Sequence, residues 1–466
     1  MPGDRKSTMK ILEISSAFPP SRGGVEMTVS ELSNRLAEMG HEVTVITSTR
    51  GGKARYSDEF VGKVRVIRLP ERLHIFEAPI LPQIAYRALF FDFDILHVHG
   101  MSPTITDLGI LVGKIKRKPV VLTYHNDAES TMEWSVAKAA ARVYARLCVP
   151  VVGMADSIIC ATNSYGTSSP VLKHFRGRME VIPLGVDVTR FSRPRPRPSS
   201  NDRKEVLFVG QLKEYKGVNF LIEAIAKLRR NGANVTLNIA GDGPSLPRLK
   251  AMVETLDIGD SVRFLGNLDN LDLADSYDSC DLVVLPSISR REAFGLVQLE
   301  ASAAGKAVVA SDIPGVSDVT KRLGGYLAKP SDADSLAIQI ARALGVKQDP
   351  ERFREAAASM SWDKVTIEYE ELFQTLLKNP VPPTLEPSSG HGPLAPLPEL
   401  SDSPDSPRIS QSFGVGSNTT KTHWWGVVSH SFENLAGWLL GNGYIIMAAA
   451  AAIFVSIYLM GSINLP

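Results

Sequence analysis

Along residues 9–311, short runs of apolar and often β-branched residues alternate with amphipathic stretches, and no other feature limits the fold as much. The series begins with MKILEIS, continues with VEMTVSELSNRLAEMG, which has apolar residues at helical spacing, and then reaches HEVTVIT. A strand, a helix and a second strand in this order are typical of a βαβ unit. The alternation therefore predicts an α/β fold built on parallel sheets.

The alternation occurs in two series, which are separated by PRPRPSSNDR. In the first series we expect further strands at DILHVHG, PVVLTYH, DSIICAT and MEVIPL, and helices at 103–115, 134–153 and 165–174. In the second we expect strands at EVLFVG, NVTLNIAG, SVRFLG, DLVVLPS and AVVAS, and helices at 218–230, 245–256 and 295–304. Because 466 residues exceed what one core usually supports, we predict two Rossmann-like, doubly wound parallel-sheet domains, at 1–190 and 191–378. Ligands of such sheets bind beyond the carboxyl ends of the strands, so the domains should face a cleft.

The end of the chain has a different composition. Residues 379–423 are rich in Pro, Ser and Gly and predict an extended linker. Residues 434–466 contain no Asp, Glu, Lys or Arg, and the stretch Gly443 to Gly461 would span about 28 Å as a helix, close to the thickness of a bilayer core. We expect residues 424–466 to form a membrane anchor with a single transmembrane helix at about 441–461, with a buried core helix as the alternative.

Charge and cysteine usage bear on the compartment and the partners. Residues 1–198 hold 27 Lys/Arg against 19 Asp/Glu, and the rest holds 24 against 31. A basic half attracts an anionic membrane surface or a phosphorylated substrate, or is only a solvated face. No recognised motif accompanies this charge, so we expect no nucleic-acid partner. The three cysteines form no CxxC pair and the N-terminus has too short an apolar run for a signal peptide, so we expect the globular domains in the cytoplasm.

Several polar or glycine residues lie at predicted strand ends. Gly23 and Gly24 separate the first strand from the first helix, where backbone N–H groups can bind an anion, or where they form an ordinary tight turn. His125 ends the strand VVLTY, as a cleft residue or as a structural hydrogen-bonding group. Lys213 and Lys216 precede the helix at 218–230, and two cations at a positive helix end indicate a shared anionic ligand unless they are solvated loop lysines.

The segment PSISRREAFGLVQLEASAAG is the most informative one. Glu292 and Glu300 are eight residues apart, and the helix between them is almost entirely small or apolar. Glu300 would be costly to bury without a polar partner, and a hydroxyl-rich ligand would meet that need.

These residues together resemble the retaining family 4 glycosyltransferases (glycosyl transferases group 1) of GT-B fold, over roughly residues 9–375. The motifs are EAFGLVQLE, RGGVE, VVLTYH, VIPLGVD with Phe191, GDGP at 241–244 and the KG pair at 216–217. The resemblance implies transfer of a hexose-type sugar from a UDP or GDP donor to an acceptor hydroxyl, with retention of configuration.

The resemblance also implies roles for individual residues. The implied catalytic residues are His125, Lys216 and Glu292, with Gly23 and His125 on the acceptor side. The implied donor-binding residues are Gly24, Gln211, Lys213, Lys216, Glu292, Ala293, Phe294, Gly295, Leu296 and Glu300. Glu292 would bind sugar hydroxyls, Glu300 the ribose and Lys216 the phosphates. Gln211 stands where the family usually has Arg, and we expect Lys213 to supply the missing cation.

The same resemblance leads to expectations about cofactors and the acceptor. Asp92-Phe93-Asp94 is similar to the DxD metal motif of the other glycosyltransferase fold, but it directly precedes an apolar strand, so we expect no metal and no cofactor. An anchored enzyme usually acts on an anchored substrate, so we expect a lipid-linked or phospholipid acceptor, with Lys114, Lys116, Arg117 and Lys118 docking on anionic headgroups. A non-catalytic sugar-nucleotide-binding subunit and a GT-B epimerase or phosphorylase are the alternatives.

Overall fold

The computed structural model describes residues 8–21, 23–49, 56–71, 74–75, 78–102, 104–127, 135–191 and 203–379. Contacts divide the chain into Met1–Val381 and Pro382–Pro466. The predicted anchor, and the predicted linker beyond residue 379, lie outside the described residues. Within the described ranges, no helix combines the length and the apolar composition that a membrane crossing requires.

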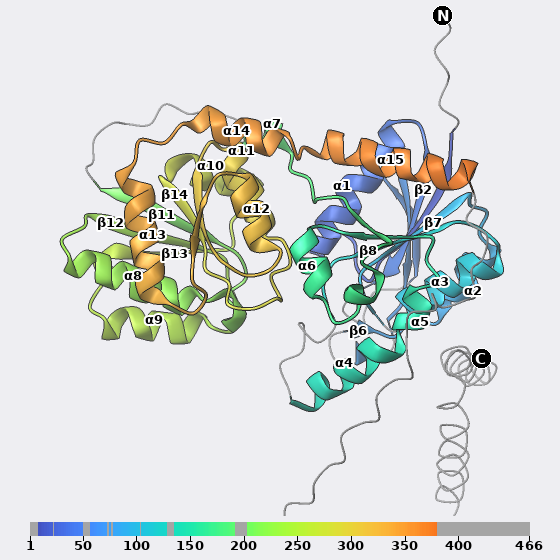
Figure 1. Ribbon diagram of the computed structural model, residues 1–466, viewed down its shortest axis with the longest axis horizontal. Coiled ribbons are helices and arrows are strands. Elements are labelled where there is room, and N and C mark those ends of the chain that lie inside the picture. Colours follow the sequence, from blue (N-terminus) through green and yellow to red (C-terminus); the bar gives the residue numbers. More distant parts are fainter. Residues whose placement is uncertain are drawn as a thin grey trace, which may run out of the picture. The chain divides into compact units, whose positions relative to one another are not determined.

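The first sheet of the described part has eight strands in the order β10-β9-β8-β7-β1-β2-β4-β3 (Figure 1). All neighbouring pairs are parallel except β3 and β4. The strands are β1 (Lys10–Ile14), β2 (Glu42–Ser48), β3 (Ser57–Val61), β4 (Val64–Leu69), β7 (Ile95–His99), β8 (Val120–Tyr124), β9 (Ser157–Cys160) and β10 (Met179–Val181), and β5 (His74–Ile75) pairs separately with β6 (Ala78–Pro79).

The second sheet has six parallel strands in the order β13-β12-β11-β14-β15-β16, again among the described residues. They are β11 (Lys204–Val209), β12 (Val235–Ala240), β13 (Val262–Gly266), β14 (Leu282–Leu285), β15 (Ala307–Ser311) and β16 (Tyr326–Ala328). The central strands are buried on both faces, as expected where helices cover a parallel sheet on both sides. This arrangement confirms the predicted α/β architecture with two parallel sheets.

Helices connect the strands of both sheets. Those of the first sheet are α1 (Gly24–Glu38), α2 (Gln83–Phe90), α3 (Thr106–Ile115), α4 (Ser135–Leu147), α5 (Val149–Val152), α6 (Asn163–Ser168), η2 (Leu172–Phe175) and α7 (Val188–Phe191). Those after β11 are η3 (Glu214–Lys216), α8 (Val218–Arg230), α9 (Leu246–Thr255), η4 (Gly259–Ser261), α10 (Asn270–Ser279), α11 (Leu296–Ala303), α12 (Val316–Arg322), α13 (Ala333–Gly345), α14 (Pro350–Ala358) and α15 (Trp362–Lys378).

Two predicted helices are divided in the structure. The segment predicted as a helix at 165–174 consists of α6 and the 3₁₀ helix η2, because Pro170 lies between them and cannot continue the hydrogen-bond ladder. The segment predicted at 134–153 consists of α4 and α5, and Pro150 stands in the first turn of α5. Proline is tolerated in a first turn, so the second helix begins there.

The last described helix joins the first core and not the second. Trp362, Val365, Tyr369 and Phe373 of α15 are buried in one cluster with residues of β1, β2 and α1. Close to its start, Ser361 forms a parallel bridge with Val186, so the two segments that connect the sheets are paired. The limits 1–190 and 191–378 remain a prediction about the sequence. In space, α15 belongs with the first sheet (Figure 1).

Candidate active site

A pocket of about 500 Å³ lies at the carboxyl ends of the strands, where residues of both sheets meet. The first sheet contributes the β1–α1 turn and the residues after β8, and the second contributes the ends of β11 and β12, the residues after β13 and the loop that leads into α11. Of the predicted site residues, all but Lys213 line this pocket: Gly23, Gly24, His125, Gln211, Lys216, Glu292, Ala293, Phe294, Gly295, Leu296 and Glu300. The structure thus brings together motifs that lie up to about 280 residues apart.

Lys216 and Glu292 form an ion pair at one side of the pocket. The Lys216 Nζ lies 2.5 Å from Glu292 Oε2, and Ser287 Oγ donates a second hydrogen bond of 3.0 Å to the same oxygen. Each side chain of the pair is 12% exposed. Burial alone would lower the pKa of Lys216, but the adjacent carboxylate outweighs burial and the pKa is raised. A cation is therefore fixed at the pocket wall at all physiological pH values.

Two helices begin at the pocket, from opposite sheets. Gly295 is the N-terminal cap residue of α11 with φ 79°, and a Cβ there would lie 2.4 Å from Leu285 Cδ2, so only glycine fits. Across the pocket, Gly23 is the cap residue of α1, and a Cβ on Gly24 would lie 3.7 Å from Leu296 Cδ1. No side chain that the structure describes caps either helix. Their backbone N–H groups form a positive environment suited to an anion, and at α1 the buried Glu26 carboxylate shares this environment in the first turn.

Glu300 lines the pocket from within α11, but its polar partner belongs to the protein. The hydroxyl of Tyr277 in α10 donates a hydrogen bond of 2.6 Å to Glu300 Oε2. Burial raises the pKa of Glu300 despite that hydrogen bond. The expectation that a hydroxyl-rich ligand must compensate its burial was therefore incomplete, because Tyr277 satisfies one of its two oxygens.

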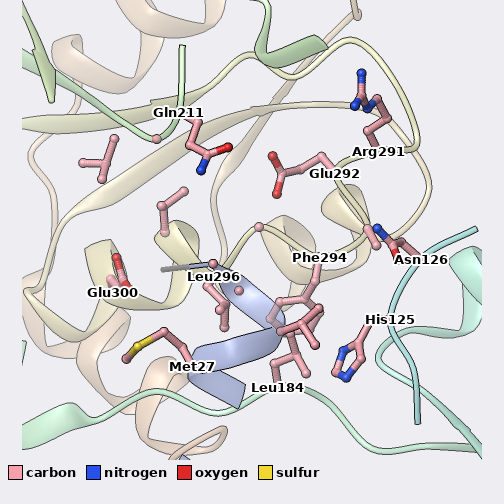
Figure 2. A pocket seen from close by; sticks show the side chains of 18 of the residues that line it. Met27, His125, Asn126, Leu184, Gln211, Arg291, Glu292, Phe294, Leu296 and Glu300 are labelled. Carbon is pink, nitrogen blue, oxygen red and sulfur yellow. The ribbon is translucent and has the colours of Figure 1, made fainter. Parts of the chain in front are cut away.

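His125 follows β8 directly and lies at the opposite wall, close to Phe294 in the view of Figure 2. Its Nε2 is 3.3 Å from Nδ1 of His99 at the end of β7. Burial, and then the neighbouring His99 and His97, hold the pKa of His125 well below its usual value. The imidazole is therefore neutral at neutral pH.

The structure does not place Lys213 in the pocket, so the expectation that it replaces the missing arginine near Gln211 is not supported by its position. Arg291 is the cation that the sequence reasoning missed. It lines the pocket beside Glu292, and its guanidinium lies over the Tyr215 ring at 4.7 Å from the centroid. Its signal was the pair Arg290-Arg291 directly before the predicted Glu292.

Five further polar residues of the pocket were also missed: Thr123, Tyr124, Asn126, Tyr215 and Asn267. Asn126 and Tyr215 adjoin His125 and Lys216 in sequence, and Asn267 follows the strand β13 directly. The strand-end argument applied to His125 would also have identified Asn267.

Asp92 and Asp94 have structural partners outside the pocket. Asp94 Oδ2 accepts a hydrogen bond of 2.8 Å from the backbone N–H of Lys10, and Asp92 Oδ2 lies 2.6 Å from Lys10 Nζ. Phe93 between them is buried. These carboxylates therefore fix the start of β1 beside β7. This position agrees with the prediction that Asp92-Phe93-Asp94 directly precedes a strand.

Comparison with known protein families gives two adjoining matches. The model described as Glycosyltransferase Family 4 matches residues 22–190, and the model described as Glycosyl transferases group 1 matches residues 190–360. A protein of Mycobacterium tuberculosis H37Rv named glycogen synthase is 29% identical over 374 residues, which cover 75% of this chain and 89% of that protein. The phosphatidyl-myo-inositol mannosyltransferase of Mycolicibacterium smegmatis is 27% identical over 372 residues, with 76% and 90% covered.

Solved structures agree on the fold. The sucrose-phosphate synthase of Thermosynechococcus elongatus superposes with a TM-score of 0.64 at 24% identity, over 79% of this chain and 99% of that one. HepE of Anabaena, solved in complex with UDP, gives a TM-score of 0.60 at 19% identity, over 79% and 100%. Two matched halves, two parallel sheets and a pocket between them lead to one assignment: the chain belongs to the family 4-type glycosyltransferases of GT-B fold.

Proposed function

We propose that this glycosyltransferase moves a hexose-type sugar from a UDP or GDP donor to a lipid-linked or phospholipid acceptor, with retention of configuration and without a metal cofactor. The observation that supports the donor best is the Lys216–Glu292 pair, which stands in a pocket where α1 and α11 begin. A fixed cation and two helix N-termini suit a diphosphate, and a carboxylate beside them suits sugar hydroxyls. HepE, which shares the fold, is described in complex with UDP.

In the proposed reaction, the protein stabilises the departing diphosphate and supplies no carboxylate nucleophile. Lys216, the backbone N–H groups from Ala293 to Leu296 and the start of α1 bind the negative charge that develops on the leaving oxygen. Glu292 orients the sugar, and Glu300, already fixed by Tyr277, binds the ribose with its other oxygen. The leaving phosphate accepts the proton of the acceptor hydroxyl on the same face. The cationic wall takes the electrostatic role that a metal has in other transferases.

A second cation on the diphosphate would come from Arg291. In this proposal Arg291 takes the role of the arginine that Gln211 replaces, because its side chain lines the pocket and Lys213 does not. Its stacking on Tyr215 limits its rotamers, which lowers the entropy lost when a phosphate binds.

The acceptor proposal depends on the surface of the first sheet's helices. On the neighbouring helices α2 and α3, Phe90 is 77% exposed, Ile115 68% and Tyr86 61%. Of the basic residues expected to dock there, Lys114 pairs with Asp156 and Lys116 donates to the Leu89 carbonyl, so their charges are partly engaged. We propose that exposed apolar side chains and Arg117 together contact an anionic membrane surface. The mycobacterial mannosyltransferase relative, whose name includes a phosphatidylinositol, supports a phospholipid acceptor.

Localisation follows the same proposal. The predicted C-terminal anchor holds the enzyme at a membrane, with its globular part in the cytoplasm. A non-catalytic subunit that only binds a sugar nucleotide is the second candidate, because Gln211 departs from the family pattern.

The test measures free nucleoside diphosphate released by the full chain in detergent from a panel of UDP- and GDP-sugars, with and without membrane lipid extract and EDTA. We expect one donor to give lipid-dependent, EDTA-resistant turnover that is lost in Glu292→Gln. The matched control is Glu214→Gln, whose carboxylate is 81% exposed and pairs with Arg248 outside the pocket. Turnover that needs a divalent ion contradicts the proposal that no metal cofactor is required. Tight donor binding without turnover favours the non-catalytic binding subunit.

A further inference from the structure

Arg290 belongs to the half of the molecule that contains the second sheet, but its side chain contacts the half that contains the first. It lies in the loop between β14 and α11, two residues before Glu292. Its Nη2 donates a hydrogen bond of 2.9 Å to Oδ2 of Asp127, which stands two residues after His125. This ion pair therefore joins the two chain segments that form opposite walls of the pocket.

The Asp127 carboxylate is fixed by its own half. Its side chain is 6% exposed. Tyr124 and Ser169 donate hydrogen bonds of 2.8 and 2.5 Å to Oδ1, and the Tyr165 hydroxyl donates one of 3.2 Å to Oδ2. Burial, and then the adjacent Asp127, raise the pKa of both tyrosines, so their hydroxyls keep their protons. A buried carboxylate with three hydroxyl donors is an acceptor of fixed position.

The Arg290 guanidinium has further partners on α6 of the first half. Its Nη1 donates to the carbonyl oxygen and to the hydroxyl of Ser168, at 2.9 and 2.6 Å. Its central carbon lies 4.7 Å from the centroid of the Tyr165 ring, and 30% of the side chain is exposed. A planar guanidinium that is bound through both terminal nitrogens and stacked on a ring has a fixed orientation, unlike a cation of a simple surface ion pair.

The same helix makes a second contact with the other half. The backbone N–H of Ser164 donates a hydrogen bond of 2.9 Å to Asp318 in α12, and its hydroxyl accepts one of 2.9 Å from the N–H of Gly315. A Cβ on Gly315, where φ is 89°, would lie 2.0 Å from the carbonyl oxygen of Ala293, so only glycine permits this approach. Because Ala293 lines the pocket, α6 contacts the donor-binding loop through Arg290 and supports it through Gly315.

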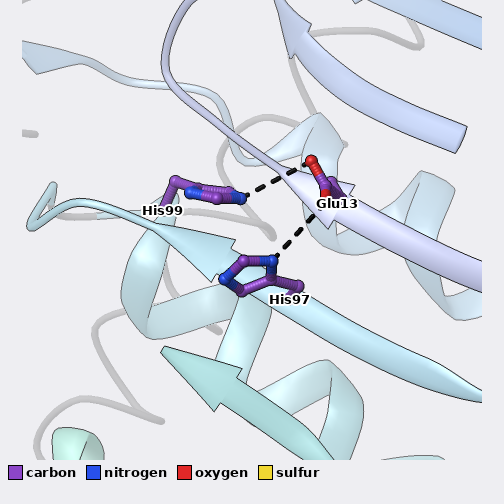
Figure 3. A group of neighbouring side chains, drawn as sticks. All are labelled: Glu13, His97 and His99. Carbon is purple, nitrogen blue, oxygen red and sulfur yellow. Dashed lines mark ion pairs between the residues drawn. The ribbon is translucent and has the colours of Figure 1, made fainter. Parts of the chain in front are cut away.

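The wall that carries His125 is built within the first half. The Nδ1 of His99 lies 3.3 Å from Nε2 of His125. Behind these rings, the side chains of Glu13, His97 and His99 are 0% exposed, with 3.5 Å between Nδ1 of His97 and Oε1 of Glu13 (Figure 3). Three neighbouring strands, β1, β7 and β8, therefore support this wall.

The wall that carries Glu292 is likewise built within the second half. Lys216 and Ser287 both bind the Glu292 carboxylate, and the Arg291 guanidinium lies over the Tyr215 ring. Each wall thus has internal contacts of its own. What the contacts of α6 add is the separation between the two walls.

We infer that Asp127 and Arg290 are positioning residues, which fix the distance between the donor-binding loop and His125 and so align the bound donor with the acceptor hydroxyl. Neither residue lines the pocket, so each acts through the segment that carries it. An error of about 1 Å in the placement of reacting groups costs on the order of 100-fold in rate. The inference rests on the proposed function, which places the donor at Glu292 and the acceptor at His125.

Arg290→Met breaks the pair without leaving a buried carboxylate unsatisfied. Asp127 retains its three hydroxyl donors, so the variant should fold. Arg290→Lys keeps the charge but loses the fork of donors, and its effects should be intermediate. The matched control is Arg229→Met in α8, since Arg229 is also 30% exposed and pairs with Asp260, but both of these residues belong to the second half.

The first readout is the distance between the two halves, which requires no substrate. The three native cysteines are buried, so spin labels attach to the full chain at Lys173→Cys and Lys321→Cys, two exposed positions in η2 and α12. We expect a narrow distance distribution in the protein with both labels and in Arg229→Met, and a broader one in Arg290→Met. A distribution that is already broad before Arg290 is replaced, or that does not change afterwards, would overturn the inference.

Kinetics provide the second readout. We expect kcat of Arg290→Met, and of Asp127→Asn, to fall about 10- to 100-fold. Affinity for the nucleoside diphosphate should change less than about threefold, because Lys216 and Glu292 remain paired. Arg229→Met should keep both values.

Two kinetic results would contradict the positioning role. An equal loss of kcat and of nucleotide affinity would show that Arg290 binds the donor, and an unchanged kcat in folded Arg290→Met would show that the pair aligns nothing. If the unsubstituted protein turns over no donor while the distance distribution broadens in Arg290→Met, the pair does fix the two halves, and the proposed function fails instead.

Discussion

Replacing Lys216 by methionine tests the electrostatic argument most directly. Methionine is similar in length and apolar, so the variant removes the charge 2.5 Å from Glu292 and little else. If Lys216 binds the departing diphosphate, its loss should lower kcat/KM by about 100- to 1,000-fold, or roughly 3 to 4 kcal/mol of transition-state stabilisation. Release of nucleoside diphosphate at saturating acceptor is the assay.

Stability must be separated from activity in the same experiment. Each side chain of the pair is 12% exposed. Loss of the ion pair should therefore lower the free energy of unfolding by about 1 to 3 kcal/mol, which is more than for a surface ion pair and less than for a fully buried one. Among the described residues, the Glu292 carboxylate then keeps the Ser287 hydroxyl as its side-chain donor. Adding Glu292→Gln should therefore restore thermal stability, because no unpaired charge remains, but should not restore turnover.

The control is Lys227→Met in α8, which breaks an ion pair with Asp334 on the protein surface. It should leave kcat/KM within a factor of about two, since the side chain lies outside the pocket. Turnover of Lys216→Met within threefold of the unsubstituted enzyme, in a folded protein, would refute the view that this lysine stabilises the leaving group.

Three further predictions follow from other contacts of the same fold. Arg291→Ala should raise the donor KM about tenfold in a titration of turnover against donor, whereas Lys213→Ala should leave the KM unchanged. The opposite pattern would show that Lys213, and not Arg291, supplies the second positive charge on the diphosphate. Tyr277→Phe removes the 2.6 Å hydrogen bond to Glu300, so the free energy of unfolding should fall by about 1 to 2 kcal/mol and the donor affinity by several-fold. Calorimetry and a donor titration measure the two effects, and if neither changed, the role given to this hydrogen bond would be wrong. Burial raises the pKa of Asp107 to about 7, so the stability that its protonated carboxyl contributes is fully present below about pH 4 and is lost as pH rises through 7. In denaturant unfolding, Asp107→Asn should remove this fall in the free energy of unfolding and be up to a few kcal/mol more stable than the unsubstituted protein at pH 8. If both proteins lose stability equally between pH 4 and pH 8, the raised pKa of Asp107 is contradicted.

Much of the fold could be predicted because parallel strands buried on both faces have a clear apolar pattern. The helix at 218–230 was predicted with its observed limits, because Gly217 directly precedes it and its apolar residues recur at helical spacing. The return of α15 to the first core could not be predicted. Its apolar residues indicate a helix with one buried face, but they do not indicate which of two similar cores covers that face.

The site shows the same division between local and long-range information. Glu292 and Lys216 were found because each lies in a short motif next to a helix start. The contact of His99 with His125 was missed, although each histidine lies at the end of a strand, because only the strand order places β7 beside β8. Arg291 was missed for a different reason, since a surface loop is the usual place for two consecutive arginines.

The helix α15 also determines which half of the molecule bears an external load. The chain leaves the described region at Asn379, directly after a helix whose apolar residues are part of the first core. Any segment beyond that point pulls on the half that supplies Gly24 and His125. The half with Lys216 and Glu292 is joined to it by the paired segments at Val186 and Ser361 and by contacts such as the Arg290–Asp127 ion pair. A load applied beyond Asn379 would therefore act first on the half that supplies His125 and would reach the half with Lys216 through these contacts.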